Sequence, residues 1–161
     1  MNDSDVIIYT DGSSRGNPGP GGYGIVMEHC KSGYVKEYSK GFKLTTNNRM
    51  ELMAVIEALK KLKQTNLKIT VYTDSKYVVD SIEKKWLFKW EKIKFKNKKN
   101  VDLWLDFLSL YKKNRIKFRW IKGHNDHPQN ERCDKLAFNA ASGENLFSDT
   151  GYEDNDLNTL F

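Results

Sequence analysis

The order in which hydrophobic periods change along the chain is the feature that most limits its fold. Apolar runs typical of strands cover 6–10, 23–29 and 33–44. They are followed over 47–62 by apolar residues at the spacing of an amphipathic helix. Further segments are predicted as strands at 67–73 and 116–121 and as helices at 75–83, 101–111 and 131–141. This order predicts an α/β domain with a five-stranded mixed sheet flanked by helices.

Local signals set the expected boundaries of these elements. The glycine- and proline-rich segment 16–22 predicts a turn, and the short segment 30–33 suits an antiparallel hairpin. Ser75 is a possible helix cap. In the predicted helix 101–111, Val101, Leu105 and Leu108 are expected near one face.

Length and charge restrict the class of protein. The chain has 161 residues, enough for one domain with a substantial core. Its net charge of +6 is compatible with a polyanionic partner but proves none. No apolar run approaches the roughly 20 residues of a membrane span, and the polar N-terminus does not resemble a secretory signal. Cys30 and Cys133 are expected to be free thiols of a cytoplasmic protein.

Four carboxylates occupy positions that favour a shared site. Asp11 and Asp74 each follow an apolar strand, Glu51 lies near a helix start, and Asp134 lies within the last helix. If the two strands are parallel neighbours, Asp11 and Asp74 lie close together, and such carboxylates need a proton or a cation. Oxygen ligands favour Mg²⁺. Taken singly, these residues can equally be turn formers, a dipole partner or surface residues, so spacing alone defines no metal site.

Several motifs, in order and at compatible spacing, resemble those of type 1 ribonucleases H. The first is Tyr9-Thr10-Asp11-Gly12-Ser13 with Gly16-Asn17-Pro18-Gly19, and the second is Thr45-Thr46-Asn47-Asn48-Arg49-Met50-Glu51-Leu52. The third is Thr73-Asp74-Ser75 with Tyr77-Val78, and the fourth is Lys122-Gly123-His124 followed by Asn130-Glu131-Arg132-Cys133-Asp134. Asp149-Thr150-Gly151-Tyr152 resembles the C-terminal end of bacterial members. The resemblance covers about residues 5–152.

The resemblance implies the ribonuclease H-like fold and a metal-dependent endoribonuclease. Asp11, Glu51, Asp74 and Asp134 would bind two Mg²⁺ ions, for which Mn²⁺ can substitute. The enzyme would hydrolyse the RNA strand of RNA–DNA hybrids and leave 5′-phosphate and 3′-hydroxyl ends. His124 would assist proton transfer or product release, although His127 lies close by and both histidines could be solvated loop residues. A zinc site of His124, His127 and Cys133 lacks a clear fourth ligand.

The resemblance also implies which residues contact each strand of the hybrid. The RNA-strand contacts would be Gly12, Ser13, Asn17 and Asn47, which suit recognition of the 2′-hydroxyl. Asn47 and Asn48 are also common helix-cap types. The DNA strand would be held by Thr46 and Arg49, which correspond to a phosphate pocket, and by a basic protrusion.

The basic protrusion is expected at about residues 84–100. Its stretch from 84 to 99 carries eight lysines, one acid and four interleaved aromatics, a composition suited to a phosphate backbone. Trp86, Trp90, Lys89 and Lys92 are the predicted DNA-strand contacts. A solvated helical face with core aromatics is the alternative.

The predicted organisation is one ribonuclease H domain at 1–152 and an acidic C-terminal tail at 153–161. Much of the chain from Ser142 onward, which has five acids and no Lys or Arg, is expected to be loosely ordered. A monomer without membrane association is expected. The alternative function is a non-catalytic hybrid-binding module, which would share the fold but lack cleavage; the four intact carboxylates argue for the enzyme.

Overall fold

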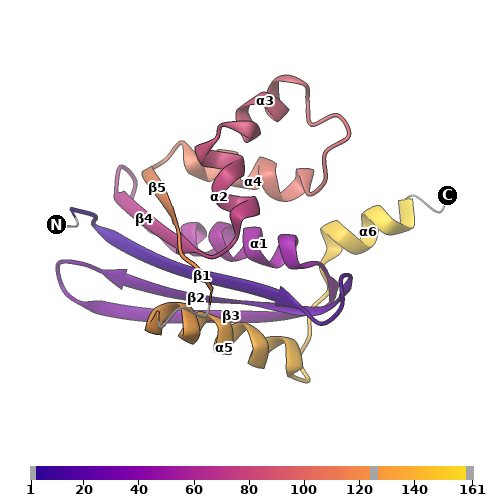
Figure 1. Ribbon diagram of the computed structural model, residues 1–161, viewed down its shortest axis with the longest axis horizontal. Coiled ribbons are helices and arrows are strands. Elements are labelled where there is room, and N and C mark those ends of the chain that lie inside the picture. Colours follow the sequence, from indigo (N-terminus) through magenta and orange to yellow (C-terminus); the bar gives the residue numbers. More distant parts are fainter. Residues whose placement is uncertain (1–2, 124–126, 159–161) are drawn as a thin grey trace.

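The computed structural model describes residues 3–123 and 127–158, and in residues 155–158 it describes the backbone only. The described chain forms one mixed sheet with helices on both faces (Figure 1). The strands are β1 (Val6–Ser14), β2 (Gly19–His29), β3 (Tyr34–Thr45), β4 (Lys68–Thr73) and β5 (Arg115–Trp120). The helices are α1 (Asn47–Lys60), α2 (Lys76–Glu83), α3 (Trp86–Lys92), α4 (Val101–Tyr111), α5 (Pro128–Ser142) and α6 (Thr150–Asn158).

The sheet has the strand order β3-β2-β1-β4-β5. β1, β2 and β3 are antiparallel neighbours, whereas β4 is parallel to both β1 and β5. This confirms the five-stranded mixed α/β sheet predicted from the sequence. The arrangement also makes the strands that lead to Asp11 and Asp74 parallel neighbours, in register from Val6 opposite Ile69 to Tyr9 opposite Tyr72.

Helices cover the two faces of the sheet unequally. On one face, α1 packs on β1 and β2 and contacts α4 and α2, and the main core lies here. On the other face, α5 packs on β1, β2 and β3. A smaller core of Tyr9, Val26 and Cys133 lies beneath α5. The alternation of β1 explains this division, because Ile8 points into the α1 side and Tyr9 into the α5 side.

Four local expectations are corrected by the structure. β1 does not end before Asp11 but continues to Ser14, because its antiparallel pairing with β2 extends beyond its parallel pairing with β4. The predicted turn 16–22 is shorter, since the glycines from Gly19 belong to β2 and pair with β1 or β3. Leu105 is 53% exposed and does not share the buried face of α4. Thr46, rather than an asparagine, caps α1.

The segment after Ser142 is also more ordered than predicted. Phe147 forms a bridge with Phe42 of β3, Asp149 is buried, and α6 begins at Thr150. The helix runs to Asn158, across the domain boundary expected after Tyr152. Acidic composition suggested a solvated tail, but the buried partner of Asp149, described below, was not visible in that composition.

None of the helices in the described part of the chain is long and apolar enough to cross a membrane. Cys30 and Cys133 are both free thiols, as predicted, and Cys133 is buried.

Candidate active site

The site begins where β1 passes close to the first turns of α1. A Cβ atom at Gly12 would lie 2.4 Å from the carbonyl carbon of Met50, so only glycine allows this approach. The Gly12 N–H donates to Asp11 Oδ1 at 2.9 Å and also to Glu51 Oε1. One backbone donor therefore links two carboxylates from different elements and fixes their relative position.

The other two carboxylates come from the neighbouring strand and from the helix on the opposite face. Asp74 follows β4 directly, and Ser75 then caps α2 by accepting from the Val78 N–H at 3.2 Å. Asp134 lies on α5 next to Cys133, whose thiol donates to the Tyr9 carbonyl oxygen at 3.2 Å. This contact holds α5 against β1 and so positions the helix turn that carries Asp134.

Together these elements bring the four predicted carboxylates to one pocket. Ligand oxygens of Asp11, Glu51 and Asp74 all lie within 4.8 Å of one another. Asp134 lines the same open pocket of about 410 Å³. The carboxyl ends of two parallel strands meet here, which is the usual place for a ligand in such sheets.

Burial and nearby negative charge strongly perturb the pKa values of Asp11 and Glu51. Burial, followed by the charge of Asp74, raises the pKa of Asp11 to about 8. Burial, followed by the charges of Asp11 and Asp74, raises the pKa of Glu51 well above its ordinary value. Without a compensating cation, the cluster therefore holds protons near neutral pH.

The donor set fits a hard divalent cation. It consists of carboxylate oxygens, two of them from buried side chains, with an opening to solvent on one side. The thiol of Cys133 is engaged with the Tyr9 carbonyl and lies outside the acidic cluster. Its pKa is raised by burial, so it is a poor source of a thiolate ligand.

His124, the predicted proton-transfer residue, lies outside the described residues. The nearby His127 has a structural role, since its Nδ1 accepts from the Asn130 N–H and caps α5. Its ring lies 5.4 Å from that of Tyr9 and 6.2 Å from that of Tyr72. His127 is therefore part of the packing between α5 and the sheet, not a solvated loop residue.

Three of the four residues expected to contact RNA lie at one rim of the carboxylate pocket. Gly12, Ser13 and Asn47 line it. Asn47 Oδ1 accepts from the Ser14 N–H at 2.6 Å, and the Asn47 N–H donates to Asn17 Oδ1 at 3.2 Å. These bonds tie the loop after β1 to the start of α1, so the polar groups are held in place beside Glu51.

A second pocket, of about 440 Å³, lies beyond this rim. It is lined by Asn17, Pro18, Thr46, Asn48, Arg49, Lys98, Lys99, Asn100, Val101 and Tyr152. Thr46 and Arg49 were predicted as DNA-strand contacts. The lysines at 98 and 99 and Tyr152 were not singled out, because the sequence did not show that 98–100 and 152 would meet the start of α1.

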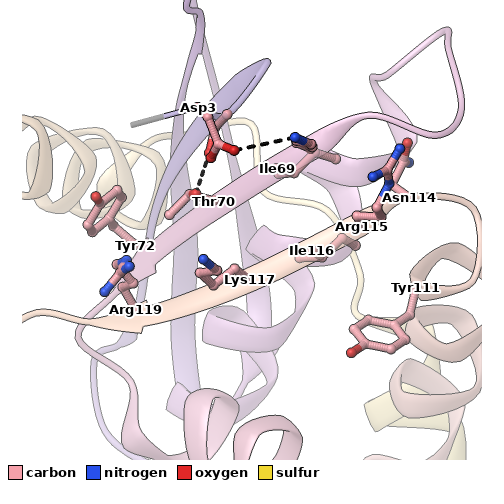
Figure 2. A pocket seen from close by; sticks show the side chains of 12 residues that line it. Asp3, Ile69, Thr70, Tyr72, Tyr111, Asn114, Arg115, Ile116, Lys117 and Arg119 are labelled. Atoms are coloured by element: carbon pink, nitrogen blue, oxygen red, sulfur yellow. Dashed lines mark hydrogen bonds and ion pairs between the residues drawn. The ribbon is translucent and has the colours of Figure 1, made fainter. Parts of the chain in front are cut away.

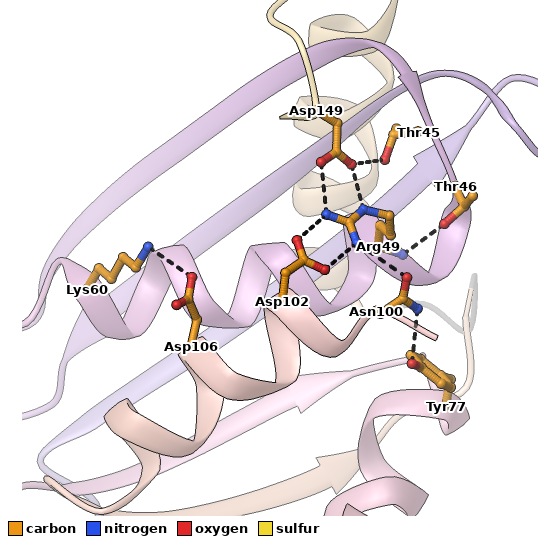
Figure 3. A network of polar contacts seen from close by, with 9 residues as sticks. All are labelled: Thr45, Thr46, Arg49, Lys60, Tyr77, Asn100, Asp102, Asp106 and Asp149. Atoms are coloured by element: carbon orange, nitrogen blue, oxygen red, sulfur yellow. Dashed lines mark hydrogen bonds and ion pairs between the residues drawn. The ribbon is translucent and has the colours of Figure 1, made fainter. Parts of the chain in front are cut away.

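Arg49 is far more buried than a surface phosphate ligand would be, with 2% of its side chain exposed. Its guanidinium donates from Nε and Nη2 to Asp149, at 2.7 and 2.9 Å, and from Nη1 and Nη2 to Asp102, at 2.8 and 2.7 Å (Figure 3). Asp149 also accepts from the Thr45 hydroxyl at 2.7 Å. Burial lowers the pKa of Arg49, but its bonds to both carboxylates outweigh this and raise it. The network joins α1, α4 and the segment that leads into α6.

The basic protrusion consists of α3 and the following loop, which project from the sheet (Figure 1). Lys89 and Lys92 are exposed, and Trp86 is 40% exposed beneath Lys84. Trp90 instead packs edge-on against the buried Trp104, with ring centroids 6.0 Å apart. The aromatics thus divide between surface and core: Trp90 belongs to the packing that the alternative expected, and DNA-strand contact by the exposed residues stays a prediction.

Comparison with known proteins agrees with this geometry. The profile of the RNase H family matches residues 3–142. Ribonuclease H of Nitratidesulfovibrio vulgaris is 48% identical over 157 residues, which cover 94% of this chain and 99% of that protein. Ribonuclease H of Desulforamulus reducens is 51% identical over 147 residues, covering 88% and 91%.

Solved structures with the same fold include LC9-RNase H1, a type 1 RNase H with the type 2 active-site motif. It aligns with a TM-score of 0.78 at 32% identity, over 96% of this chain and 81% of the other. LC11-RNase H1, solved in complex with an RNA/DNA hybrid, aligns with a TM-score of 0.68 at 28% identity, over 85% and 96%. Since the family profile spans most of the chain and full-length relatives share about half of its residues, the chain belongs to the ribonuclease H family, as its type 1 motifs predicted, and is a nuclease.

Proposed function

We propose that the protein is an endoribonuclease that hydrolyses the RNA strand of RNA–DNA hybrids by a mechanism with two divalent cations. The observation that carries this proposal is the convergence of Asp11, Glu51 and Asp74 within 4.8 Å, with Asp134 in the same pocket. Membership of the family and the hybrid bound to LC11-RNase H1 support the substrate.

The four carboxylates would hold two Mg²⁺ ions, or Mn²⁺ in their place. When bound, such ions make water a better nucleophile at neutral pH and offset the charge that develops on the leaving oxygen. A bond forms between the water oxygen and phosphorus, and the bond from phosphorus to the 3′ oxygen breaks. The products carry 5′-phosphate and 3′-hydroxyl ends.

Residues of the chain prepare the site before substrate arrives. The Gly12 N–H holds Asp11 and Glu51 together, and the Cys133 contact fixes the helix that carries Asp134. Such fixed ligands need little reorganisation during the reaction. His124 would carry a proton to or from the reacting groups near neutral pH, or assist product release.

The selectivity for hybrids would come from two sets of residues, one for the RNA strand and one for the DNA strand. Gly12, Ser13, Asn17 and Asn47 would meet the RNA strand, where Asn47 already anchors the loop after β1. Thr46 would hold a DNA-strand phosphate in the second pocket. Arg49 lines that pocket too, and its bonds to Asp102 and Asp149 make it chiefly a residue that shapes the pocket. Trp86, Trp90, Lys89 and Lys92 of α3 would follow the same strand.

Cleavage of an end-labelled RNA–DNA hybrid tests the proposal. RNA–RNA, DNA–DNA and single-stranded RNA serve as control substrates, with Mg²⁺, with Mn²⁺ and with EDTA. We expect cutting of the hybrid RNA alone, lost with EDTA and in Asp11→Asn, and retained in Asp106→Asn, which removes an exposed carboxylate outside the site. Tight hybrid binding without cutting in either metal would instead support the non-catalytic module.

Metal binding can be measured without an activity assay. Mg²⁺ should raise the melting temperature of the wild-type protein, because a ligand that binds only the native state stabilises it. Asp11→Asn should weaken this response.

We also expect a cytoplasmic monomer, and gel filtration tests the oligomeric state.

A further inference from the structure

Four exposed cations gather on β4 and β5, away from the pockets described above. They are Lys68, Arg115, Lys117 and Arg119, which we call the β4–β5 basic strip. They line an open pocket of about 730 Å³ together with residues that include Asp3 and Ser4. Figure 2 shows Asp3 beside Thr70 of β4. β5 is an edge strand of the sheet, so one side of the strip is open to solvent.

Strand geometry places these cations on one face in a regular row. Arg115, Lys117 and Arg119 alternate with the core residues Ile116 and Phe118. They therefore point away from the α1 side, at intervals of about 6.6 Å. In register with them on β4 lie Lys68, Thr70 and Tyr72, respectively. α5 covers β1, β2 and β3 on this face but leaves the strip exposed.

Two carboxylates lie beside the Lys68 end of the strip: Asp3, and Asp5, which accepts from the Lys68 backbone N–H at 2.9 Å. Asp3 pairs with Lys68 at 3.3 Å and is itself 81% exposed. Among the ion pairs of the described residues, none involves Arg115, Lys117 or Arg119. Like charges opposite each other on paired strands are unfavourable. Basic residues on an edge strand discourage aggregation, but that role does not require a row of them facing a pocket.

One end of the strip lies near the carboxylate pocket, because β4 leads from the strip to Asp74. Tyr72 lies opposite Arg119 at one end of the strip, and Asp74 follows two residues later, directly after the end of β4. The Tyr72 ring stacks on Tyr9, with centroids 5.2 Å apart, and Tyr9 is two residues from Asp11 on β1. A nucleic-acid strand that leaves the carboxylate pocket along this face would meet the Tyr72 ring first and then the cations.

We propose that the β4–β5 basic strip binds a single-stranded extension of the RNA strand where it runs out of the hybrid beside Asp74. This inference rests on the proposed function, because it extends the same substrate. Single-stranded nucleic acid is bound by a positive groove that follows the backbone, together with aromatic rings. The strip supplies the positive charge, and Tyr72 opposite Arg119 supplies an aromatic ring. The regular spacing of the cations along β5 suits successive phosphates of an extended chain.

Binding is measured by fluorescence anisotropy in the Asp11→Asn background, where the hybrid should stay uncut. The probes are a blunt hybrid and the same hybrid with an extension of about eight nucleotides of RNA on either end, or of DNA. One RNA extension should tighten binding about tenfold, because three added phosphate contacts deepen the salt slope by about 2. Arg115→Gln/Lys117→Gln/Arg119→Gln should abolish this gain and leave blunt-hybrid binding unchanged.

The matched control neutralises three exposed lysines at or near the opposite edge of the sheet: Lys31→Gln/Lys36→Gln/Lys43→Gln. This variant should keep the full gain. Equal binding of blunt and extended hybrids, equal loss in the control, or a gain only with DNA extensions would overturn the proposal. The proposal would also be overturned if the strip substitutions weakened the binding of poly-glutamate but not that of the extended hybrid. That result would assign the strip to an acidic protein partner. Failure of the wild-type enzyme to cut the blunt hybrid would count against the proposed function alone.

Discussion

At the scale of single residues, burial of the carboxylate cluster makes the stability of the metal-free protein depend on pH. Burial and Asp74 raise the pKa of Asp11 to about 8 in the folded state. An unfolded chain gives aspartate a pKa of about 4. The folded state therefore binds the proton more tightly, and this contribution to stability is full below pH 4 and is lost as the pH rises to about 8.

We predict that Asp11→Asn stabilises the protein in EDTA at pH 8 by roughly 1–3 kcal/mol, because it removes a charge that the folded state disfavours. Thermal unfolding in EDTA should show the wild-type melting temperature falling between pH 5 and pH 8, with a flatter profile for Asp11→Asn. Glu144→Gln, at an exposed position, serves as the control and should follow the wild type. A lower stability of Asp11→Asn at pH 8 would contradict the repulsion inferred for the cluster.

Arg49 makes the second prediction at this scale. Arg49→Met leaves Asp149 buried without its cation, so it should destabilise the fold by about 3–5 kcal/mol. Urea unfolding in Mg²⁺ measures this loss. The control is Arg132→Met, whose partner Glu37 is exposed, and little change is expected. Equal effects of the two substitutions would show that the buried network adds no particular stability.

At the scale of elements, the position of α5 depends on the close approach of β2. A Cβ atom at Gly24 would lie 2.2 Å from the Cys133 carbonyl oxygen, and a backbone oxygen within α5 cannot move away alone. The short distance between helix and sheet lets the Cys133 thiol reach Tyr9. The same contact determines where Asp134 stands.

Gly24→Ala should therefore displace α5 and lower kcat by at least about tenfold, because small misplacements of catalytic groups are costly. The hybrid KM should change less, since the pocket of Thr46 lies on the other side of the site. Gly143→Ala, at the end of the same helix, makes only ordinary contacts and has a φ of −74°, so it should retain activity. A wild-type kcat in Gly24→Ala would show that the close contact between Gly24 and α5 is not needed to position Asp134.

At the scale of the whole molecule, the charges divide into distinct regions. The protrusion from 84 to 99 is strongly basic, while the segment after Ser142 is acidic and is tied through Asp149 to Arg49. Lys98 and Lys99 line the second pocket, next to Thr46. The net charge of +6 therefore understates the positive field on the side where the hybrid is proposed to bind.

We predict that hybrid affinity falls steeply with salt and that Lys89→Gln/Lys92→Gln/Lys98→Gln/Lys99→Gln flattens the slope of log affinity against log salt by up to about 4. The measurement is anisotropy of a blunt hybrid over a salt series in the Asp11→Asn background. Lys31→Gln/Lys36→Gln/Lys43→Gln again serves as the control and should keep the wild-type slope. An unchanged slope in the quadruple variant would show that the protrusion does not contact the hybrid.

The sequence by itself determined the type and order of the main elements. Their signals are local: apolar alternation or runs in strands, helical spacing in α1, and capping at Ser75. The motifs also indicated Asp11, Glu51, Asp74 and Asp134 and the ribonuclease H family. Asp74 directly follows a strand, and Asp11 lies just beyond the parallel pairing of β1 with β4, so the linear sequence carries information about the carboxyl edge of a parallel sheet.

Only the tertiary structure decided how distant segments neutralise or expose charge. Much of the chain from Ser142 onward was expected to be loosely ordered, but Asp149 in this segment is the buried partner of Arg49, 100 residues away. The sequence predicted a strand at 116–121 but not that Arg115, Lys117 and Arg119 would share a face with Lys68 of β4. Ion pairs and patches depend on which elements become neighbours, and long-range contacts leave no periodic signal in the chain.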